Sequence, residues 1–454
     1  MRRIAMAMAA ALLLAFGVGA CGGTGDDDTA DKAAGAPAPK PGRLEPADLT
    51  LWVGFSAPRE LRVFKGAVKE FEQLNPGINV KVVGGISDDK LIAASRGGKA
   101  PDVAQSFSAD NAGAFCGSGA WIDLEPYLER DGISDDIFPP APRSYTQFKG
   151  TRCALPMLAD TYGLYYNQDM LEKAGLDGPP KTVSELTEYA KKLTVKNPDG
   201  SLEVVGFNPS MNWYSNTPAN FGPMFGGRWV DESGKSTLGS DPAWAKLLTW
   251  QKDLIDWYGY DKLVKFQAGL GDEYSTSNAF EKGKLALHVD GEWRTAFIAD
   301  EAPDLDYGTA PVPVDEDNSD LYGGGYTTGN IAGIPKRAGH KEQAWALLKF
   351  LTTDDRAMVM LSNGLRNVPT TASSAKSPDL KPDPKFDTFV KIFENEHTTT
   401  TPITAAGSAY QELFNGFVNK WQAGRVSDLE GGLADIDKQI DAQLANVEGG
   451  QDVP

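Results

Sequence analysis

The feature that most constrains the fold is a strand, helix and strand in succession across residues 49–82. Residues 49–53 (LTLWV) are apolar apart from Thr50, which is typical of a buried strand. Apolar residues then recur at helical spacing over residues 61–74, and Asn75-Pro76-Gly77 ends that helix. Alternating apolar residues at 78–82 predict a second strand. The pattern predicts a βαβ unit, and therefore parallel strands joined by a right-handed crossover.

Helix signals of the same kind recur further along the chain. Thr182 and Glu185 have capping-box spacing ahead of an apolar helix pattern. Asp241-Pro242 provides an N-cap and a first-turn proline for another helix. A long amphipathic stripe runs through residues 426–444. With 454 residues, these patterns predict an α/β protein of more than one domain, with helices added at its C-terminal end.

The N-terminus predicts export. Arg2 and Arg3 precede an apolar run, and small residues lead to Cys21, so residues 1–20 are expected to be a signal peptide. Cys21 in this position resembles the lipobox of bacterial lipoproteins, in which the cysteine is lipidated and becomes the mature N-terminus. Residues 21–46 then form the lipidated cysteine and a flexible tether, because Gly, Ala, Pro and Asp dominate the segment. The alternative is an ordinary secretory signal with an incidental cysteine.

Two further cysteines are present, Cys116 and Cys153. In an oxidising compartment a lone pair of cysteines is expected to form a disulfide. Two unrelated buried thiols are the alternative.

Composition excludes several functional classes. The formal net charge is −18 and no block of Lys or Arg occurs, which disfavours nucleic acid and membrane-surface binding. The three histidines, His288, His340 and His397, show no metal-ligand spacing, so no metal site and no cofactor are predicted. The glycine-rich stretch at 322–330 lacks the following helix that a dinucleotide site needs.

Aromatic residues are plentiful, and several stand at strand ends or in polar loops. They are Trp52, Phe55, Trp213, Tyr214, Trp293, Tyr326 and Tyr410. Flat apolar rings beside amide and carboxylate groups suit a sugar, which packs a C–H face on a ring and offers hydroxyls to acceptors. The alternative for each of them is a place in a hydrophobic core.

Several motifs, in their order along the chain, resemble one family. They are LTLWVGF (49–55), GGKAPDVAQSF (97–107), GAWIDLEPYL (119–128), ALPMLADTYGLYYNQDMLEKAGL (154–176), PPKTVSELTEYAKKL (179–193), AFEKGKLALHVDGEW (279–293), YGTAPVP (307–313) and HKEQAWALLKFLTTD (340–354). The chain resembles extracellular solute-binding proteins of ABC importers, in the group of maltose- and oligosaccharide-binding proteins. The resemblance covers nearly all of the chain after the tether.

The resemblance implies a periplasmic-binding-protein-like fold of type II, in which two α/β lobes close on a ligand. Lobe I is expected at residues 47–157 and 308–352, and lobe II at residues 158–307 and 353–448. Hinge crossings are expected near residues 156–160, 307–311 and 352–367. The implied function is that of an importer's substrate-binding component, which captures a di- or oligosaccharide outside the membrane and delivers it to the permease. A lipid-anchored monomer on the outer face of the bacterial membrane is expected, without catalysis.

The resemblance also implies ligand-binding positions. Glu292 and Trp293 match a sugar-stacking turn, and Asp160 matches a carboxylate that accepts sugar hydroxyls. Trp213 and Tyr214 match the aromatic contacts of the second lobe. First-lobe contacts match Phe55, Ser56 and the loop Gln105 to Asn111, with Gln105 and Ser106 as its named contacts. Trp52, Tyr326 and Tyr410 are added from the aromatic pattern. Two positions depart from maltose binders, because no Asp-Arg pair is clear at Ala109-Asp110 and Gln411 stands where an aromatic residue is expected.

The turn Asp290-Gly291-Glu292-Trp293 carries two acids at the end of an apolar strand. We expect Asp290 to cap the helix that begins near Trp293, and Glu292 to accept ligand hydroxyls. A glycosidase is the alternative, but its two acids must lie on opposite sides of the substrate, whereas acids on one turn lie on the same side. A structural role as an adhesin or sensor is a third class, and the sequence does not test it.

Overall fold

The computed structural model describes residues 44–56 and 58–448, which all belong to one compact unit of the chain. The predicted signal peptide, Cys21 and almost all of the tether lie outside the described residues. The strands are β1 (Ala47–Trp52), β2 (Ile78–Val83), β3 (Val103–Ser106), β4 (Ala154–Asn167), β5 (Val195–Lys196), β6 (Leu202–Phe207), β7 (Leu285–Gly291), β8 (Tyr307–Ala310), β9 (Thr327–Gly333) and β10 (Val368–Pro369).

The α-helices are α1 (Pro58–Leu74), α2 (Asp88–Gly97), α3 (Ala112–Gly117), α4 (Glu125–Asp131), α5 (Pro140–Tyr145), α6 (Gln168–Lys173), α7 (Val183–Lys192), α8 (Pro218–Phe225), α9 (Pro242–Tyr258), α10 (Tyr260–Ala268), α11 (Arg294–Glu301), α12 (Lys341–Thr353), α13 (Asp355–Leu365), α14 (Ala372–Ala375), α15 (Pro384–Glu394), α16 (Ala409–Gln422) and α17 (Leu429–Glu448). Three short 3-10 helices are η1 (Ala109–Asn111), η2 (Asp135–Ile137) and η3 (Glu316–Leu321).

The first βαβ unit forms as the sequence predicts. Strands β1 and β2 pair in parallel, with Ala47 opposite Ile78 and Trp52 opposite Val83, and α1 connects them. Helix α1 buries Phe64, Val68 and Phe71 on one face. The capping box at Thr182 and the Asp241 N-cap with Pro242 in the first turn are also confirmed.

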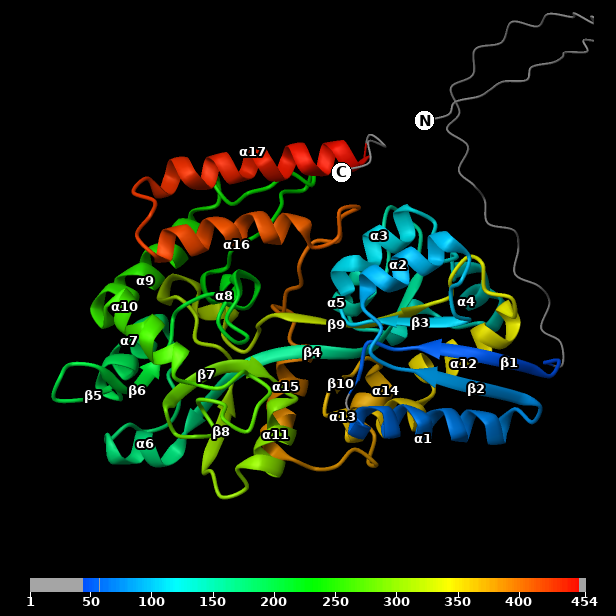
Figure 1. Cartoon of the computed structure of the whole chain (residues 1–454), viewed down its shortest axis with the longest axis horizontal. Helices are drawn as coiled ribbons and strands as arrows, with labels where there is room; N and C mark the ends of the chain where they lie inside the picture. The colour runs from blue at the N-terminus through cyan, green and yellow to red at the C-terminus, as the bar shows by residue number, and fades with distance from the viewer. Residues whose placement is uncertain (1–43, 57, 449–454) are drawn as a thin grey trace, which may run out of the picture. The chain divides into compact units, whose positions relative to one another are not determined.

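Strand β4 joins the two halves of the sheet. The order is β2-β1-β3-β9-β4-β7-β6-β5, with β10 and β8 also paired to β4. The first half of β4, Ala154 to Thr161, pairs antiparallel with β9, and its second half pairs with β7 and β8. Figure 1 shows β4 as the long central strand, with β1 and β2 toward one end of the sheet and β6 toward the other.

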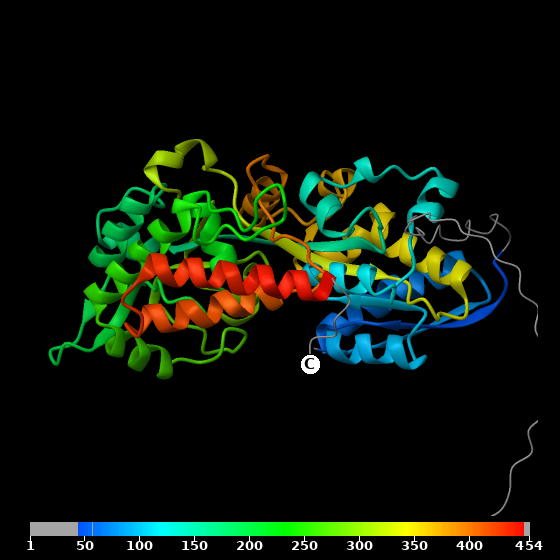
Figure 2. The same cartoon turned by 90° about the horizontal axis from the view of Figure 1, so that it is seen from above.

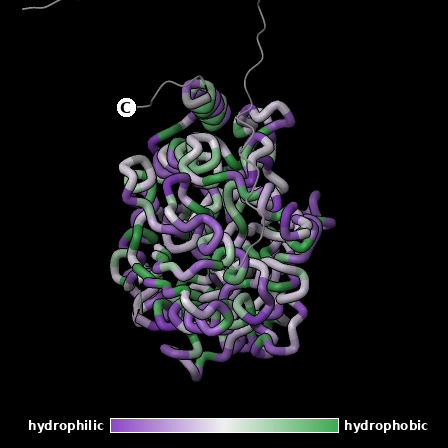
Figure 3. Tube along the Cα trace, turned by 90° about the vertical axis from the view of Figure 1, so that its right-hand side faces the viewer, coloured by the Kyte–Doolittle hydropathy of each residue, from purple (hydrophilic) through white to green (hydrophobic). Residues whose placement is uncertain are grey.

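Separate hydrophobic cores define two lobes. Residues from β1, α1, α12 and α13 form one core, and a smaller neighbouring cluster includes Trp121, Cys153 and Ile331. Residues from β6, β7, α9, α15 and α16 form the other core. Helices α16 and α17 lie side by side over this second lobe (Figures 1 and 2). Hydrophilic and hydrophobic segments are interspersed over the trace instead of gathering in one region (Figure 3).

The packing differs from the predicted lobe ranges at two places. Residues 308–325 were expected in lobe I, but β8 pairs with β4 beside the second core, and Val312 is buried there. Helix α13 was expected in lobe II, but Ala357, Met358 and Leu361 belong to the lobe I core. In both cases the chain crosses later than predicted because the apolar face of the element packs on the lobe it is leaving.

The chain therefore crosses between the lobes along β4, near residues 325–327, and over residues 366–383. It also returns to lobe I at residues 399–404, where Ile403 packs against the smaller cluster and Thr401 Oγ1 donates to Asp110 Oδ1 at 2.5 Å. This last passage was not predicted from the sequence.

The predicted disulfide between Cys116 and Cys153 is present. It ties the end of α3 to the residue before β4 within lobe I, across a sequence separation of 37 residues. Such a ring stabilises a fold by about 4 kcal/mol in the chain-entropy model.

Candidate functional site

The candidate site lies where the crossing segments meet. Asp160 on β4, Glu292 just after β7 and Asn367 just before β10 come together at the hinge. The side-chain amide of Asn367 donates to both acids, at 2.6 Å to Asp160 Oδ1 and at 3.0 Å to Glu292 Oε1. Three distant parts of the sequence therefore share one polar cluster.

Glu292 is fully buried, and both of its carboxylate oxygens are occupied. Oε2 accepts the backbone N–H of Thr161 at 2.7 Å, and Oε1 accepts the amide of Asn367. We expected Glu292 to accept ligand hydroxyls, but in this structure its oxygens accept hydrogen bonds from Thr161 and Asn367 at the hinge.

Asp160 is partly exposed and is connected to lobe I through a chain of amides. Asn330 Nδ2 lies 3.4 Å from both oxygens of Asp160, and Asn330 Oδ1 accepts Gln105 Nε2 at 2.7 Å. Gln105 Oε1 in turn accepts the backbone N–H of Gly54 at 2.8 Å. The network thus runs from the end of β1 to the turn after β7.

The two hinge acids have raised pKa values. Burial raises the pKa of Asp160 to about 7, although the hydrogen bond from Asn367 acts in the opposite direction. Burial, together with the charge of Asp160, raises the pKa of Glu292 well above its ordinary range. Two acids in this arrangement do not both ionise readily, so the pair retains a proton near neutral pH.

Three aromatic rings adjoin the acids. Trp293 meets Tyr162 edge to face, with ring centroids 5.4 Å apart, and Tyr162 lies 5.6 Å from Tyr326. The Trp293 ring is partly exposed, and its buried Nε1 has no hydrogen-bond partner among the described residues. A partly exposed flat ring in a turn that also carries a carboxyl group is suited to a hydroxylated ligand.

Gly291 is needed for the position of this indole. A Cβ atom added to Gly291 would lie 2.2 Å from the Trp293 ring, so no larger residue fits without moving the ring. The glycine in the turn therefore permits the close approach of the indole to the strand end.

Trp213 and Tyr214 form a second aromatic surface in lobe II. Their rings stack at 3.9 Å with an interplanar angle of 14°, and both are partly exposed. Tyr214 has φ +51° and neighbouring Asn212 has φ +60°, a region that costs about 1–3 kcal/mol for residues other than glycine. The Tyr214 hydroxyl donates to the Gly271 carbonyl at 2.6 Å, which holds the strained loop in place.

Lobe I contributes fewer free groups than expected. Ser106 is buried and donates to Asp88 at 2.8 Å, and Gln105 is committed to the amide chain. Phe55 is buried against Phe64, whereas Ser56 is exposed. Trp52 is partly exposed, with Lys90 Nζ 5.6 Å from the centroid of its ring.

Tyr326 and Tyr410 are buried rather than open to a ligand. Their exposed fractions are 6% and 2%. Tyr326 lies against Thr401, with 3.3 Å between the hydroxyl oxygens, and Tyr410 donates to the Pro402 carbonyl at 3.1 Å. Both support the return segment at residues 399–404.

Two further aromatic residues are exposed; Phe107 lies in the predicted contact loop Gln105 to Asn111, whereas Tyr274 was missed by sequence reasoning. Phe107, 46% exposed, lies edge to face with Phe55 at 4.6 Å, and a Cβ on Gly54 would clash with its ring at 2.4 Å. Tyr274 is 58% exposed in the loop before β7. Asn367 was also missed, since nothing in the sequence near it marks a polar hinge contact.

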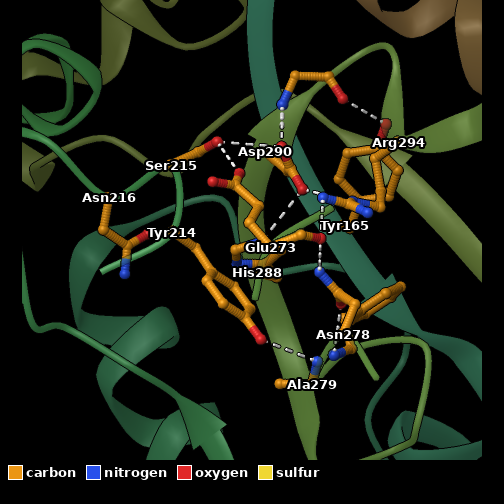
Figure 4. Close-up of polar contacts among 12 residues, drawn as sticks. Tyr165, Tyr214, Ser215, Asn216, Glu273, Asn278, Ala279, His288, Asp290 and Arg294 are labelled. Atoms are coloured by element: carbon orange, nitrogen blue, oxygen red, sulfur yellow. Dashed lines mark hydrogen bonds and ion pairs between the residues drawn. The ribbon is translucent and has the colours of Figure 1, made fainter. Parts of the chain in front are cut away.

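Asp290 does not cap α11, contrary to our expectation. Trp293 occupies the N-cap position without a side-chain cap. Asp290 Oδ2 instead accepts Arg294 Nε at 2.6 Å, and Oδ1 accepts the Gly291 N–H at 2.8 Å and the Ser215 hydroxyl at 3.1 Å (Figure 4). The strand geometry leaves Asp290 directed into lobe II, where Arg294, one helical turn later, is its partner.

Arg294 organises this second cluster. It is fully buried, and it also donates to Glu281 Oε1 at 3.1 Å and to the backbone carbonyl of Glu273 at 2.9 Å. Burial alone would raise the pKa of Asp290, but the charge of Arg294 holds it below the ordinary value. Ser215 bridges Asp290 and Glu273, and burial together with the charge of Asp290 raises the pKa of Glu273 to about 8 (Figure 4).

A groove lies apart from these residues. It has a volume of about 570 Å³ and is lined by residues 144 and 147–149 of lobe I, residues 227–230 of lobe II and residues 399–403. None of the predicted ligand-binding residues lines it. Elsewhere the lobes also touch through an exposed ion pair, Arg59 with Asp300, at 3.1 Å.

The described part of the chain contains neither a metal-binding cluster nor a membrane-spanning helix. Within residues 44–56 and 58–448, no group of three or more His, Cys, Asp or Glu side chains is arranged to hold a metal ion. In the same part of the chain, no helix has the length and apolar character needed to cross a membrane.

Comparison with known proteins identifies the family. The model of the bacterial extracellular solute-binding protein family matches residues 57–358, which is more than half of the chain. The chain therefore belongs to this family, whose members are binding proteins.

Individual relatives are consistent with that assignment. The chain is 25% identical over 346 residues to a maltotriose-binding protein of Pyrococcus abyssi (strain GE5 / Orsay), covering 75% of this chain and 70% of that protein. It is 27% identical over 315 residues to a mannitol-binding protein of Pseudomonas aeruginosa, covering 65% of this chain and 67% of that protein. The solved structure of CpMnBP1 with mannotriose bound superimposes with a TM-score of 0.76 at 26% identity, covering 87% of this chain and 99% of that one. The likeness confirms the type II periplasmic-binding-protein-like fold.

Proposed function

We propose that this protein is the substrate-binding component of an ABC importer and that it captures a di- or oligosaccharide at the hinge between its lobes. The observation that carries the proposal is the partly exposed Trp293 ring, which packs edge to face on Tyr162 in the turn that follows β7. Similarity to proteins that bind maltotriose and mannotriose supports a carbohydrate ligand.

The proposed ligand-binding surface has three parts. Trp293 and Asp160 form its floor, Trp213 and Tyr214 contribute the lobe II wall, and Trp52, Ser56 and Phe107 contribute the lobe I side. Tyr274 adds an exposed ring near the floor. Glu292, Gln105, Ser106, Phe55, Tyr326 and Tyr410 support these residues from buried positions.

The two clusters of acids support a binding role without catalysis. Sugar hydrolysis uses an acid and a second carboxylate on opposite sides of the scissile bond. Here Glu292 is buried behind the hinge and Asp290 is buried against Arg294, so neither is available opposite Asp160. We expect no new reducing ends when the purified protein is incubated with maltotriose or mannotriose, and robust turnover would reverse this assignment.

The proposed setting is the outer face of the bacterial membrane, with Cys21 as the lipidated anchor, a monomeric binding protein and permease subunits as partners. Mass spectrometry of the mature N-terminus tests the anchor, because a lipidated cysteine carries the mass of its acyl chains. An N-terminus without lipid would leave a secreted protein.

Ligand screening by thermal shift tests the sugar assignment directly. A sugar present at one hundred times its Kd stabilises the folded state by about 2.7 kcal/mol. We expect a shift with at least one oligosaccharide in a panel that includes maltotriose and mannotriose, and none with phosphorylated or amino-acid ligands. If only the non-carbohydrate ligands shift the melting temperature, the carbohydrate proposal is wrong.

A further inference from the structure

The oxygens of the hinge acids are unequally occupied. Both Glu292 oxygens accept N–H groups at 2.7 and 3.0 Å. Asp160 Oδ1 accepts Asn367 at 2.6 Å, but Asp160 Oδ2 has only the 3.4 Å contact with Asn330. Well-formed N–H···O bonds lie at about 2.7–3.2 Å, so Oδ2 is the one weakly occupied oxygen of the pair.

The surrounding amides have fixed orientations. The backbone N–H of Gly54 can only donate, so the side-chain oxygen of Gln105 must face Gly54. The NH2 group of Gln105 therefore faces Asn330. Asn330 Oδ1 is thereby used, so its NH2 group must face Asp160. Every amide around the pair therefore presents N–H, and a proton on Glu292 would displace a donor that is already in place. A proton on Asp160 Oδ2 displaces only a weak contact.

No cation among the described residues stabilises the ionised form of either hinge acid. Among the described residues, neither Asp160 nor Glu292 forms an ion pair with a lysine, arginine or histidine. Apart from each other, the titratable groups on which the charges of the two acids act are all tyrosines. They are Tyr145 on α5, Tyr162 and Tyr165 on β4, Tyr274 in the loop before β7 and Tyr326 just before β9. Burial raises the pKa of each tyrosine, so all five are neutral at physiological pH.

We propose that Asp160 carries the proton of this pair and donates a hydrogen bond to an oxygen of the bound carbohydrate, and that Glu292 is the positioning residue, because both of its oxygens are already held by N–H donors and leave the proton to Asp160. The inference rests on the proposed function for its ligand, and it reverses the acceptor role expected for Asp160. It also explains why a carboxyl pair without a cation is stable at the hinge.

The proposal predicts that affinity falls as the pH rises. Only the protonated form of Asp160 donates, so the apparent Kd increases as that form is lost. With a pKa of about 7 for Asp160, the Kd should rise roughly tenfold between pH 6 and pH 8. An acceptor carboxylate would instead bind more tightly, or equally well, at higher pH.

Infrared spectroscopy tests the proton without any ligand. The carbonyl stretch of a protonated carboxyl is recorded at pH 6 for the parent and for Asp160→Asn, and the difference spectrum removes the contribution of other protonated acids such as Glu273. We expect one protonated carboxyl to disappear in Asp160→Asn. If the variant keeps the full signal, Glu292 holds the proton and the proposal is overturned. Asp199→Asn, an exposed substitution in a lobe II loop, is the matched control.

Calorimetry with maltotriose and mannotriose tests the hydrogen bond. We expect Asp160→Asn, whose amide also donates, to bind within a fewfold of the parent at pH 6 and to lose the pH dependence. Glu292→Gln should move the fall in affinity to lower pH. A more than tenfold loss for Asp160→Asn at pH 6, or a parent Kd that does not rise with pH, contradicts the proposal. If the parent binds no sugar at any pH, the proposed function fails, and the infrared result still decides where the proton lies.

Discussion

Asp290 and Glu292 stand two residues apart at the end of one strand, both fully buried, yet their surroundings differ completely. Asp290 is paired with Arg294, which lowers its pKa, within lobe II. Glu292 faces another acid, Asp160, and its pKa is raised. Asp290, buried beside a cation, stabilises the packing of lobe II. Glu292, buried beside a second acid, makes the protonation of the hinge depend on pH.

The largest effect is expected on the Asp290 side. Arg294→Ala leaves Asp290 and Glu281 buried without their cation, and breaking a buried ion pair in this way costs about 3–5 kcal/mol. The midpoint of urea unfolding measures the loss. Arg356→Ala is the control, since that side chain is 57% exposed and its surface ion pair contributes little to stability. Equal midpoints for the two variants would show that the Arg294 cluster is not structural.

A smaller loss of stability is expected for Asp290→Asn. The amide keeps the shape but removes the charge that accepts Arg294 and Ser215, and hydrogen bonds to charged groups are worth about 1.5–3 kcal/mol. Because the cluster lies within lobe II, sugar affinity should stay close to that of the parent. A variant with parental stability but weakened binding would place Asp290 in the ligand site and remove the contrast with Glu292.

On the hinge side, Trp293→Ala should affect binding more than folding. Removing a buried aromatic anchor costs roughly 2 kcal/mol, or about thirtyfold in Kd. Calorimetry with the sugar found by screening measures it. Trp257→Ala is the matched control, because Trp257 is 37% exposed on α9 and contacts lysine side chains instead of the hinge. Parental affinity in Trp293→Ala would mean that the ligand contacts other rings.

The same contrast explains which parts of the molecule could be predicted from the sequence. The β1-α1-β2 unit, the capped helices and the aromatic turn depend on neighbouring residues, and local spacing was enough to find them. Arg294 follows Asp290 by four residues, so their pairing was open to sequence reasoning, although a capping role was preferred. The hydrogen bonds of the hinge cluster could not be predicted from the sequence. Thr161 and Glu292 are 131 residues apart, and Asn367 comes from a third segment.

The lobe boundaries show the same limit. Helix α13 has an amphipathic pattern that fits either lobe, and only its packing against α1 assigns it to lobe I. Tyr326 and Tyr410 stand among polar residues in the sequence, as Trp293 does, but the return segment at 399–404 covers them. Burial by a segment that is distant in the sequence cannot be predicted from the residues next to the buried side chain.

The pH dependence of stability should carry opposite signs for the two acids. The folded-state pKa of Asp290 is lowered, so its contribution is present above its unfolded pKa of about 4 and is lost as the pH falls through the folded pKa. The pKa of Asp160 is raised to about 7, so the folded state binds its proton more tightly than the unfolded state between about pH 4 and pH 7. Its contribution to stability is therefore full below about pH 4 and declines as the pH rises toward 7.

The smallest predicted effect follows from that sign. Between pH 6 and pH 7, loss of the Asp160 proton should lower the free energy of unfolding by about 1 kcal/mol. Other buried acids such as Glu273 titrate in the same range, so the measurement is the difference between the parent and Asp160→Asn in urea unfolding at the two pH values. We expect the variant to lose that part of the slope, while Asp290→Asn keeps it. If both variants keep the parental slope, the proton does not belong to the hinge pair, and the distinction between the two acids of the turn fails.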